Sequence, residues 1–214
     1  AVLVLHDITV IDESGVQRLA PVSLSVRAGE IVGVAGVDGG GQRELLRVLA
    51  GRQAPSAGSV HLPDSIGFVP EDRLRDAIIP GLSLVDNLAL RGAGTRHGIL
   101  RWPDLSAATR ASIRDFDVLI ADEQSTISSL SGGNQQKLLV ARWLESNSRV
   151  VIFDEPTRGI DVGAKYEMYL LINQLAAEGK VVIMISSELP EILGMSDRIL
   201  VMRRGRISAE ITDV

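Results

Sequence analysis

The sequence IVGVAGVDGGGQRELLRVLAG, residues 31–51, divides into three short segments of different character. Ile31–Ala35 is a continuous apolar run, as expected of a strand that is buried on both faces. Gly36–Gly41 is rich in glycine and predicts a tight turn. Residues 42–50 then carry leucines at helical spacing, followed by Gly51, which can cap a helix. The stretch therefore predicts a strand, a glycine loop and a helix in succession.

The glycine loop keeps the G-x-x-x-x-G frame of a phosphate-binding P-loop but lacks two side chains that complete it. Glycines there let backbone N–H groups converge on a phosphate at the positive end of a helix. Gln42 stands where a lysine would reach the phosphates, and Arg43 stands where a hydroxyl would bind Mg²⁺. For the loop alone, a tight turn without a ligand is the alternative. The candidate nucleotide-binding residues are Gly36, Val37, Asp38, Gly39, Gly40, Gly41, Gln42 and Arg43.

Arg43 is not expected to replace the missing lysine. One step along an α-helix turns the side chain by roughly 100°, so Arg43 should point away from the phosphates. Each lost charge-assisted hydrogen bond removes about 1.5–3 kcal/mol of binding energy. We therefore expect this loop to hold nucleotide weakly and to turn it over slowly or not at all.

The composition of the 214 residues is that of a globular protein, because 45% of them are hydrophobic. The 22 basic and 27 acidic side chains give a net charge of −5 without any Lys/Arg run, so we expect no nucleic-acid partner. The absence of cysteine excludes disulfides, thiol catalysis and Cys-based zinc sites. The longest apolar runs are far shorter than the ~18 residues of a membrane-spanning helix.

Short β-rich runs and helical patterns alternate along the rest of the chain. Residues 1–30 combine β-rich runs with turn residues, the pattern of antiparallel strands. From about 83 to 117 the pattern is helical but broken by glycines and Pro103, which indicates an insertion outside the core. The later alternation predicts a parallel sheet covered by helices, an α/β fold. Further strands are expected at 65–69, 150–153, 181–185, 199–202 and 207–211, and helices at 131–145, 161–177 and 187–193.

Three motifs follow one another in the second half of the chain: LSGGNQQ at 130–136, VVIFDEPT at 150–157 and RGID at 158–161. A lone Ser-Gly-Gly is a weak signal, but this ordered set behind a glycine loop strongly resembles the signature, Walker B and D-loop of ATP-binding cassette (ABC) ATPases. The resemblance covers essentially the whole chain. It implies an α/β P-loop NTPase (RecA-like) core with an N-terminal antiparallel β subdomain and an inserted α-helical subdomain.

The resemblance also implies how one nucleotide-binding domain, residues 1–214, is divided. The β subdomain would cover about 1–30, and the core would cover about 31–70 and 147–214. The helical subdomain, which carries the signature, would cover about 71–146.

The chemistry of the motif residues agrees with the roles that the family assigns. A serine and two glycines at a helix start offer backbone donors to a γ-phosphate, which in this family is held by the opposite subunit. Asp154 ends a buried strand, where it can hold Mg²⁺, and Glu155 can polarise an attacking water as the catalytic carboxylate. For these two acids alone, a solvated acid pair would be the commoner explanation. The signature residues are Ser131, Gly132, Gly133, Asn134 and Gln135, and the D-loop residue is Asp161.

Three positions depart from the common ABC pattern. The Q-loop glutamine is replaced by Glu71, and the switch histidine is replaced by Ser187. No aromatic residue stands near Val10–Asp12, where many cassettes stack adenine. The site on this chain's own loop thus lacks the lysine, the hydroxyl, the histidine and the stacking ring, yet keeps Glu155.

This combination resembles the C-terminal (second) cassette of two-cassette ATPases from bacterial importers of monosaccharides such as ribose and galactose. The similarity lies in EDR at 71–73, LSGGNQQK at 130–137, DEPTRGIDVGAK at 154–165 and SSELPEILGMSDRI at 186–199. The loop VDGGGQ at 37–42 is also similar to that of nucleoside importers. Because second cassettes of nucleoside importers often depart from D-E-P, the retained motif favours sugar.

The resemblance implies ATP and Mg²⁺ as cofactors, and a signature that completes the competent site of a partner cassette. The implied partners are a second cassette in the same polypeptide, transmembrane permease subunits and, indirectly, a periplasmic or lipoprotein solute-binding protein. The implied location is the cytoplasmic face of the cell membrane, and the isolated domain should be a weak or inactive ATP hydrolase. The alternatives are a nucleoside importer cassette, a non-transport ABC ATPase acting on DNA or ribosomes, and a nucleotide-independent scaffold domain.

Overall fold

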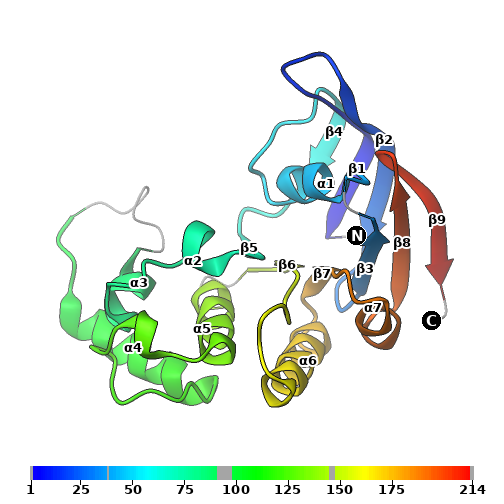
Figure 1. Ribbon diagram of the computed structural model, residues 1–214. Helices are drawn as coiled ribbons and strands as arrows, with labels where there is room; N and C mark the ends of the chain where they lie inside the picture. Colours follow the sequence, from blue (N-terminus) through cyan, green and yellow to red (C-terminus); the bar gives the residue numbers. More distant parts are fainter. Residues whose placement is uncertain (1, 38, 91–97, 145–147, 213–214) are drawn as a thin grey trace.

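The computed structural model describes residues 2–37, 39–90, 98–144 and 148–212, so Asp38 of the glycine loop lies outside the described residues (Figure 1). The strands are β1 (Leu3–Ile11), β2 (Gln17–Val26), β3 (Ile31–Gly36), β4 (Ala57–His61), β5 (Ile66–Val69), β6 (Val150–Asp154), β7 (Val181–Ile185), β8 (Arg198–Arg203) and β9 (Arg206–Thr212). The α-helices are α1 (Gln42–Leu49), α2 (Arg73–Asp76), α3 (Leu84–Ala89), α4 (Trp102–Asp115), α5 (Gly132–Leu144), α6 (Val162–Ala177) and α7 (Leu189–Met195), and Ile127–Ser129 forms a 3₁₀ turn.

The larger sheet contains six strands in the order β5-β6-β7-β3-β8-β9. Strands β5, β6, β7, β3 and β8 run parallel, and β9 pairs antiparallel with β8. β7 is buried along its whole length and β6 from Val150 to Phe153, as expected of strands covered on both faces. The predicted parallel α/β sheet is therefore confirmed, as is the predicted order of strand, glycine loop and helix in β3 and α1.

A smaller sheet of three antiparallel strands has the order β2-β1-β4. Buried and exposed residues alternate along most of β2, as in a strand with one face toward a core. The antiparallel strands expected in residues 1–30 are thus present. β4 was not predicted, because its one β-branched residue, Val60, gives no strand pattern; it forms by pairing with β1, where Val60 lies opposite Leu5.

Two apolar cores hold these sheets in place. In the first, helix α1 packs its buried leucines and Val48 between residues of the two sheets. The second lies on the other face of the larger sheet, where Phe153 and its neighbours pack against α5 and α6. Together the two cores fix the ends of β3, β6 and β7 relative to one another.

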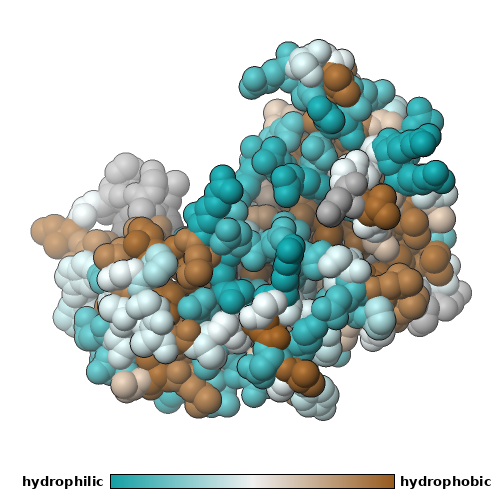
Figure 2. Space-filling model, viewed as in Figure 1, coloured by the Kyte–Doolittle hydropathy of each residue, from teal (hydrophilic) through white to brown (hydrophobic). Residues whose placement is uncertain are grey.

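The helical part, α2 to α5, is joined to the larger sheet by α5, which packs on β5. Figure 1 shows α2, α3 and α4 to one side of the strands. α3 begins at a capping box formed by Ser83 and Asp86. In space-filling view, the concave face between this helical part and the strands is mainly hydrophilic (Figure 2). Within the described ranges, no helix is both long enough and apolar enough to span a membrane.

Candidate functional site

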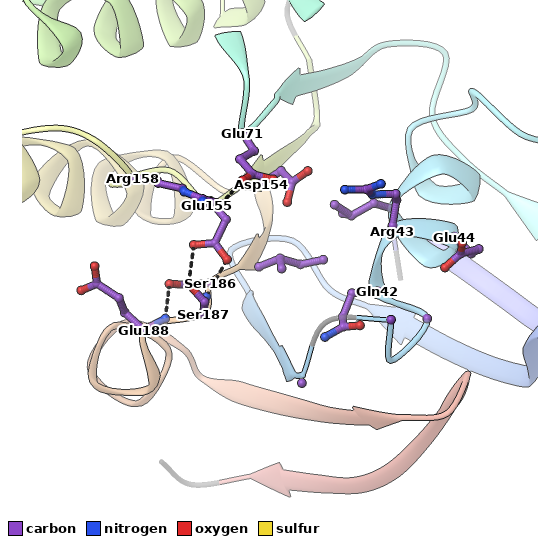
Figure 3. Close-up of a pocket in the computed structure, with 15 residues that line it drawn as sticks. Gln42, Arg43, Glu44, Glu71, Asp154, Glu155, Arg158, Ser186, Ser187 and Glu188 are labelled. Atoms are coloured by element: carbon purple, nitrogen blue, oxygen red, sulfur yellow. Dashed lines mark hydrogen bonds and ion pairs between the residues drawn. The ribbon is translucent and has the colours of Figure 1, made fainter.

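A cavity of about 760 Å³ opens at the carboxyl ends of β3, β6 and β7 (Figure 3). This edge is the usual ligand site of a parallel α/β sheet. Val37 instead lines an adjacent cavity of about 570 Å³, and Gly40 is buried. The predicted site residues that line the larger cavity are Gly36, Gly39, Gly41, Gln42, Arg43, Glu71, Asp154, Glu155 and Ser187. Its other lining residues, which were not predicted as site residues, are Glu44, Leu46, Arg158, Ile185, Ser186 and Glu188.

The glycine loop turns sharply before α1 begins. Gly39 and Gly41 have φ values of +76° and +101°, which residues with a side chain rarely adopt. A Cβ at Gly41 would also lie 2.7 Å from the Cα of Gly205, in the turn between β8 and β9. At the start of α1, Gln42 donates from Nε2 to the carbonyl of Val37 at 3.0 Å. The loop thus requires glycine, and the Gln42 amide closes onto it.

Arg43 points into the cavity, and the prediction that it points away was wrong. It lines the cavity together with Asp154, and Figure 3 shows its side chain extended from α1 toward Asp154. The prediction considered only the rotation between successive helix positions. The Cα–Cβ bonds of a helix also tilt toward its N-terminus, so a long side chain in the first turn can reach back over the loop.

Asp154 ends β6 and carries a perturbed carboxyl group. Burial and the neighbouring Glu155 raise the pKa of Asp154, Arg43 lowers it, and Asp76 raises it, with a result of about 6. The two acids sit as predicted at the end of a buried strand. Because like charges crowd here, a cationic group beside Asp154 is favourable, and Arg43 is that group.

Glu155 is held by the residue at the switch position. Its backbone has a φ of +51°, unusual for a residue with a side chain. Its carboxylate accepts from the backbone N–H of Ser187 at 2.7 Å and from the Ser187 hydroxyl at 3.1 Å. Burial raises the pKa of Glu155, while the two Ser187 bonds lower it. The serine at the predicted switch position thus orients the predicted catalytic carboxylate.

Two residues of the stretch 71–73 contact other predicted motifs, the segment after Walker B and the signature. Glu71, at the Q-loop position, pairs with Arg158, which follows the Walker B motif. Two positions on, Arg73 donates from Nε to the Oε1 of Gln135 in the signature at 2.9 Å. Neither contact was predicted, since the partners are 87 and 62 positions apart and no local pattern marks them.

The predicted signature, Ser131–Gln135, lies at the start of α5. The side chains of Ser131 and Asn134 are joined by a 3.0 Å hydrogen bond from Asn134 Nδ2. Gly133 packs closely on α6, because a Cβ there would lie 2.5 Å from that of Ala164. Among the described residues that line the P-loop cavity, none belongs to Ser131–Gln135. The structure therefore does not bring the signature into this chain's own P-loop site.

Asp161, the predicted D-loop residue, caps α6. Its side chain accepts from the N–H of Ala164 at 2.9 Å, and its own backbone is extended. It is exposed and is absent from the described lining of the P-loop cavity. Asp161 and the signature thus share one contact region, in which both approach Ala164.

The residues around Asp154 do not fit the Mg²⁺ ion that the family resemblance implies. Mg²⁺ requires near-octahedral oxygen ligands, and Arg43 occupies the sequence position of the hydroxyl ligand. A guanidinium group has donors but no acceptor, so it cannot ligate a cation. Within the part of the chain that the structure describes, no three or more His, Cys, Asp or Glu side chains are grouped to hold a metal ion.

Sequence comparison finds relatives that are named as import ATP-binding proteins. A chain from Streptomyces avermitilis, "Ribose import ATP-binding protein RbsA 1", is 45% identical over 89% of this chain and 40% of its own length. The protein of the same name from Rubrobacter xylanophilus is 44% identical over 97% of this chain and 45% of its own length. A "Putative ribose/galactose/methyl galactoside import ATP-binding protein 3" from Burkholderia cenocepacia is 39% identical over 96% of this chain and 43% of its own length. The chain spans about two fifths of the length of these curated relatives.

Structural comparison finds the same fold. The cassette MJ0796, in a dimeric post-hydrolysis state bound to ADP and Pi, has a TM-score of 0.81 at 22% identity, covering 98% of both chains. The cbiO1 protein of Clostridium perfringens has a TM-score of 0.81 at 20% identity, covering 98% of this chain and 87% of its own. These likenesses establish the P-loop NTPase fold. The family model described as "ABC transporter" matches residues 19–158, and this chain therefore belongs to the ABC transporter family as one of its ATP-binding cassettes.

Proposed function

We propose that this chain is the ATP-binding domain of a cassette ATPase that drives the import of simple sugars. ABC ATPase domains bind ATP, usually with Mg²⁺, and hydrolyse it. The observation that carries the sugar assignment is the agreement among relatives at 39–45% identity, all named as ribose or ribose/galactose/methyl galactoside import proteins. Because the matches cover 89–97% of this chain, they extend beyond the nucleotide motifs.

The chain's share of its relatives, 40–45% of their length, supports a place within a two-cassette polypeptide. The degraded P-loop and the E-D-R of residues 71–73 favour the second, C-terminal cassette. In this proposal the partners are a first cassette, permease subunits and, indirectly, a solute-binding protein, and the domain works at the cytoplasmic face of the membrane. The division into a β subdomain (about 1–30), a core (about 31–70 and 147–214) and a helical subdomain (about 71–146) belongs to the same proposal.

The two halves of the nucleotide machinery on this chain would serve different sites. The P-loop has no lysine, and its Gln42 amide is bound to the loop itself. By contrast, Ser131 is exposed at the start of α5, whose first turn contains no acidic residue to cover its positive end. An intact signature with an accessible helix terminus supports a role at the partner cassette's ATP and Mg²⁺, whereas the isolated chain would hydrolyse ATP weakly or not at all.

The role of the signature can be tested in the full two-cassette polypeptide reconstituted with its permease. Ser131→Arg places a long cation against the partner's nucleotide site, and we expect the ATPase rate to fall at least about tenfold, as when an oriented donor is lost. Ala107→Arg adds the same side chain at an exposed position of α4 and should leave the rate unchanged. Equal rates for Ser131→Arg and the control would exclude a signature acting in trans.

The sugar assignment needs a separate measurement, because no residue of this chain contacts the solute in the proposed assembly. Cells that lack the gene for the full polypeptide should lose uptake of labelled ribose or galactose and recover it when the gene is returned. Loss of nucleoside uptake with sugar uptake intact would replace the sugar proposal by the nucleoside one.

A further inference from the structure

We propose that the P-loop cavity of this cassette binds a nucleoside triphosphate without a divalent metal ion, with the Arg43 guanidinium taking the position that Mg²⁺ would occupy beside Asp154. This inference rests on the proposed nucleotide-binding role of the cavity. It differs from the family expectation, in which Asp154 holds Mg²⁺. Arg43 suits this role because of its position, its lack of an ion-pair partner among the described residues and the carboxylates around it.

The position of Arg43 is set by the start of α1. It is the second residue of that helix and follows Gln42, whose amide is bonded to the carbonyl of Val37. Figure 3 shows the Arg43 side chain crossing the cavity toward Asp154. The nearby positive charge of Arg43 also lowers the pKa of Asp154, whereas burial, Glu155 and Asp76 raise it.

Arg43 is also free to bind a ligand. Its side chain is exposed, and among the described residues it takes part in no ion pair. Arg158, the other arginine in the lining, is paired with Glu71. A guanidinium group can donate two parallel hydrogen bonds to a phosphate, which makes an uncommitted arginine a strong phosphate ligand.

The charges of the cavity explain why a cation is needed there. Its lining contains the carboxylates of Glu44, Glu71, Asp154, Glu155 and Glu188, which would repel a polyphosphate. A cation within the cavity would screen this repulsion. Here Arg43 stands between the loop and Asp154, so a metal ion at the same place would meet a like charge and would lack its hydroxyl ligand.

The remaining phosphate donors do not depend on a metal. Gly41 leads into α1, so the positive end of an eight-residue helix faces the loop. Glu44, in the first turn, lowers this contribution, and Arg43 offsets it. The predicted ligand is therefore held by the N–H groups in the first turn of α1 and by Arg43, and the Mg²⁺ that accompanies it in solution would have to be displaced or kept outside.

The test is calorimetric titration of the 214-residue chain with ATP, once in MgCl₂ and once in EDTA. We expect the Kd in EDTA to be within about threefold of the Kd in MgCl₂, or tighter, a difference of less than one factor of ten. Arg43→Ala should weaken binding in EDTA by about tenfold or more, because a charge-assisted contact is lost. Arg43→Ser restores the hydroxyl ligand and should make binding tighter in MgCl₂ than in EDTA.

Arg47→Ala is the matched control, since it removes the same charge from the exposed side of α1, outside the described lining of the cavity, and should bind ATP as the unchanged chain does. Circular dichroism checks that each variant is folded. The proposal is overturned if EDTA weakens ATP binding by the unchanged chain more than about threefold, if ATP does not bind in either buffer, or if Arg43→Ala in EDTA binds ATP less than about tenfold more weakly than the unchanged chain. None of these results bears on Ser131 or on sugar uptake, so failure here is distinguishable from failure of the proposed function.

Discussion

Ser187 donates two hydrogen bonds to Glu155, from its backbone N–H at 2.7 Å and from its hydroxyl at 3.1 Å. The predicted water-activating carboxylate is thus held by the residue at the predicted switch position.

Ser187→Ala tests this contact directly. The hydroxyl bond stabilises the ionised carboxylate, so its loss should raise the pKa of Glu155 above its value in the unchanged chain. Carbon-detected NMR titration of labelled glutamate side chains would measure the change. Ser59→Ala, on the exposed strand β4, should not move the Glu155 resonance. An unchanged Glu155 pKa in Ser187→Ala would show that the hydroxyl bond does not form in solution.

The raised pKa of Asp154 predicts how stability depends on pH. Burial and Glu155 raise this pKa from 3.8 to about 6, so between these values the folded state holds a proton that the unfolded state releases. Stability should therefore fall as pH rises through this window, by at most about 3 kcal/mol. Urea denaturation in EDTA at pH 4, 6 and 8 should show this fall for the unchanged chain.

Asp154→Asn removes the titrating group and should flatten that part of the pH profile. At pH 8 the variant should be more stable than the unchanged chain, by about 1–3 kcal/mol. Asp115→Asn, at an exposed position of α4, is the control that should keep the original profile. If the variant is less stable than the unchanged chain at pH 8, the groups around Asp154 stabilise its ionised carboxylate in the folded state.

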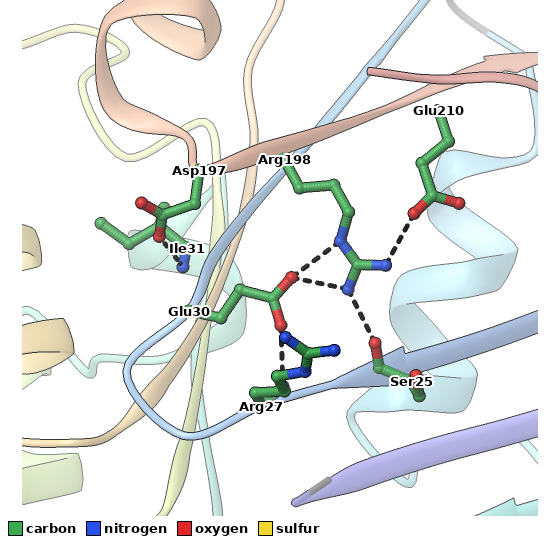
Figure 4. Close-up of polar contacts among 7 residues, drawn as sticks. All are labelled: Ser25, Arg27, Glu30, Ile31, Asp197, Arg198 and Glu210. Atoms are coloured by element: carbon green, nitrogen blue, oxygen red, sulfur yellow. Dashed lines mark hydrogen bonds and ion pairs between the residues drawn. The ribbon is translucent and has the colours of Figure 1, made fainter. Parts of the chain in front are cut away.

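The junction of the two sheets predicts a large stability effect (Figure 4). Arg198 on β8 donates to Glu30 and to the carbonyl of Ser25 at 2.7 Å each, and to Glu210 at 2.8 Å. Burial lowers the pKa of Arg198, but the carboxylates of Glu210 and Glu30 raise this pKa by more, so it is raised overall. Because the Arg198 and Glu30 side chains are only 16% and 17% exposed, Arg198→Ala should destabilise the fold by about 2–4 kcal/mol. Thermal unfolding measures this, with Arg203→Ala on the same strand expected to change little.

Two adjacent glycines of the signature should respond differently to alanine. A Cβ at Gly133 would lie 2.5 Å from that of Ala164, so α5 or α6 would have to shift to accommodate it. Gly133→Ala should therefore cost about 1–3 kcal/mol. At Gly132 a Cβ would lie 2.7 Å from the end of the Arg73 side chain and 3.2 Å from the Gly159 carbonyl oxygen and from Ile160. Because the closest of these atoms ends a long side chain and the other two are less close, Gly132→Ala should cost less stability than Gly133→Ala. Equal midpoints in denaturant for the two variants would show that α5 and α6 are not tightly packed here.

Sequence patterns predicted the framework of the site because it is encoded locally. Apolar runs marked β3, β6 and β7, and glycine density marked the loop. The last helix shows the limit of this precision: it was expected at 187–193 and is found at Leu189–Met195, because Glu188 is extended and Pro190 occupies the first turn.

The contacts between motifs could not be predicted in the same way. The pairs Glu71–Arg158 and Arg73–Gln135 join residues that only the tertiary fold brings together. The predicted direction of the Arg43 side chain was wrong for a different reason. The rotation between successive helix positions does not alone describe where a long side chain reaches. In each case the missing information was the direction of a side chain in three dimensions.

We propose that this cassette supplies its signature to a partner cassette but does not hydrolyse ATP at its own P-loop site. The direct measurement is steady-state ATP hydrolysis by the chain alone, beside the double variant Gln42→Lys with Arg43→Ser. We expect negligible ATP turnover by the unchanged chain. The double variant should bind ATP more tightly than the unchanged chain does, and its binding should depend on Mg²⁺. Turnover by the unchanged chain at the rate of a cassette with an intact P-loop would contradict this proposal.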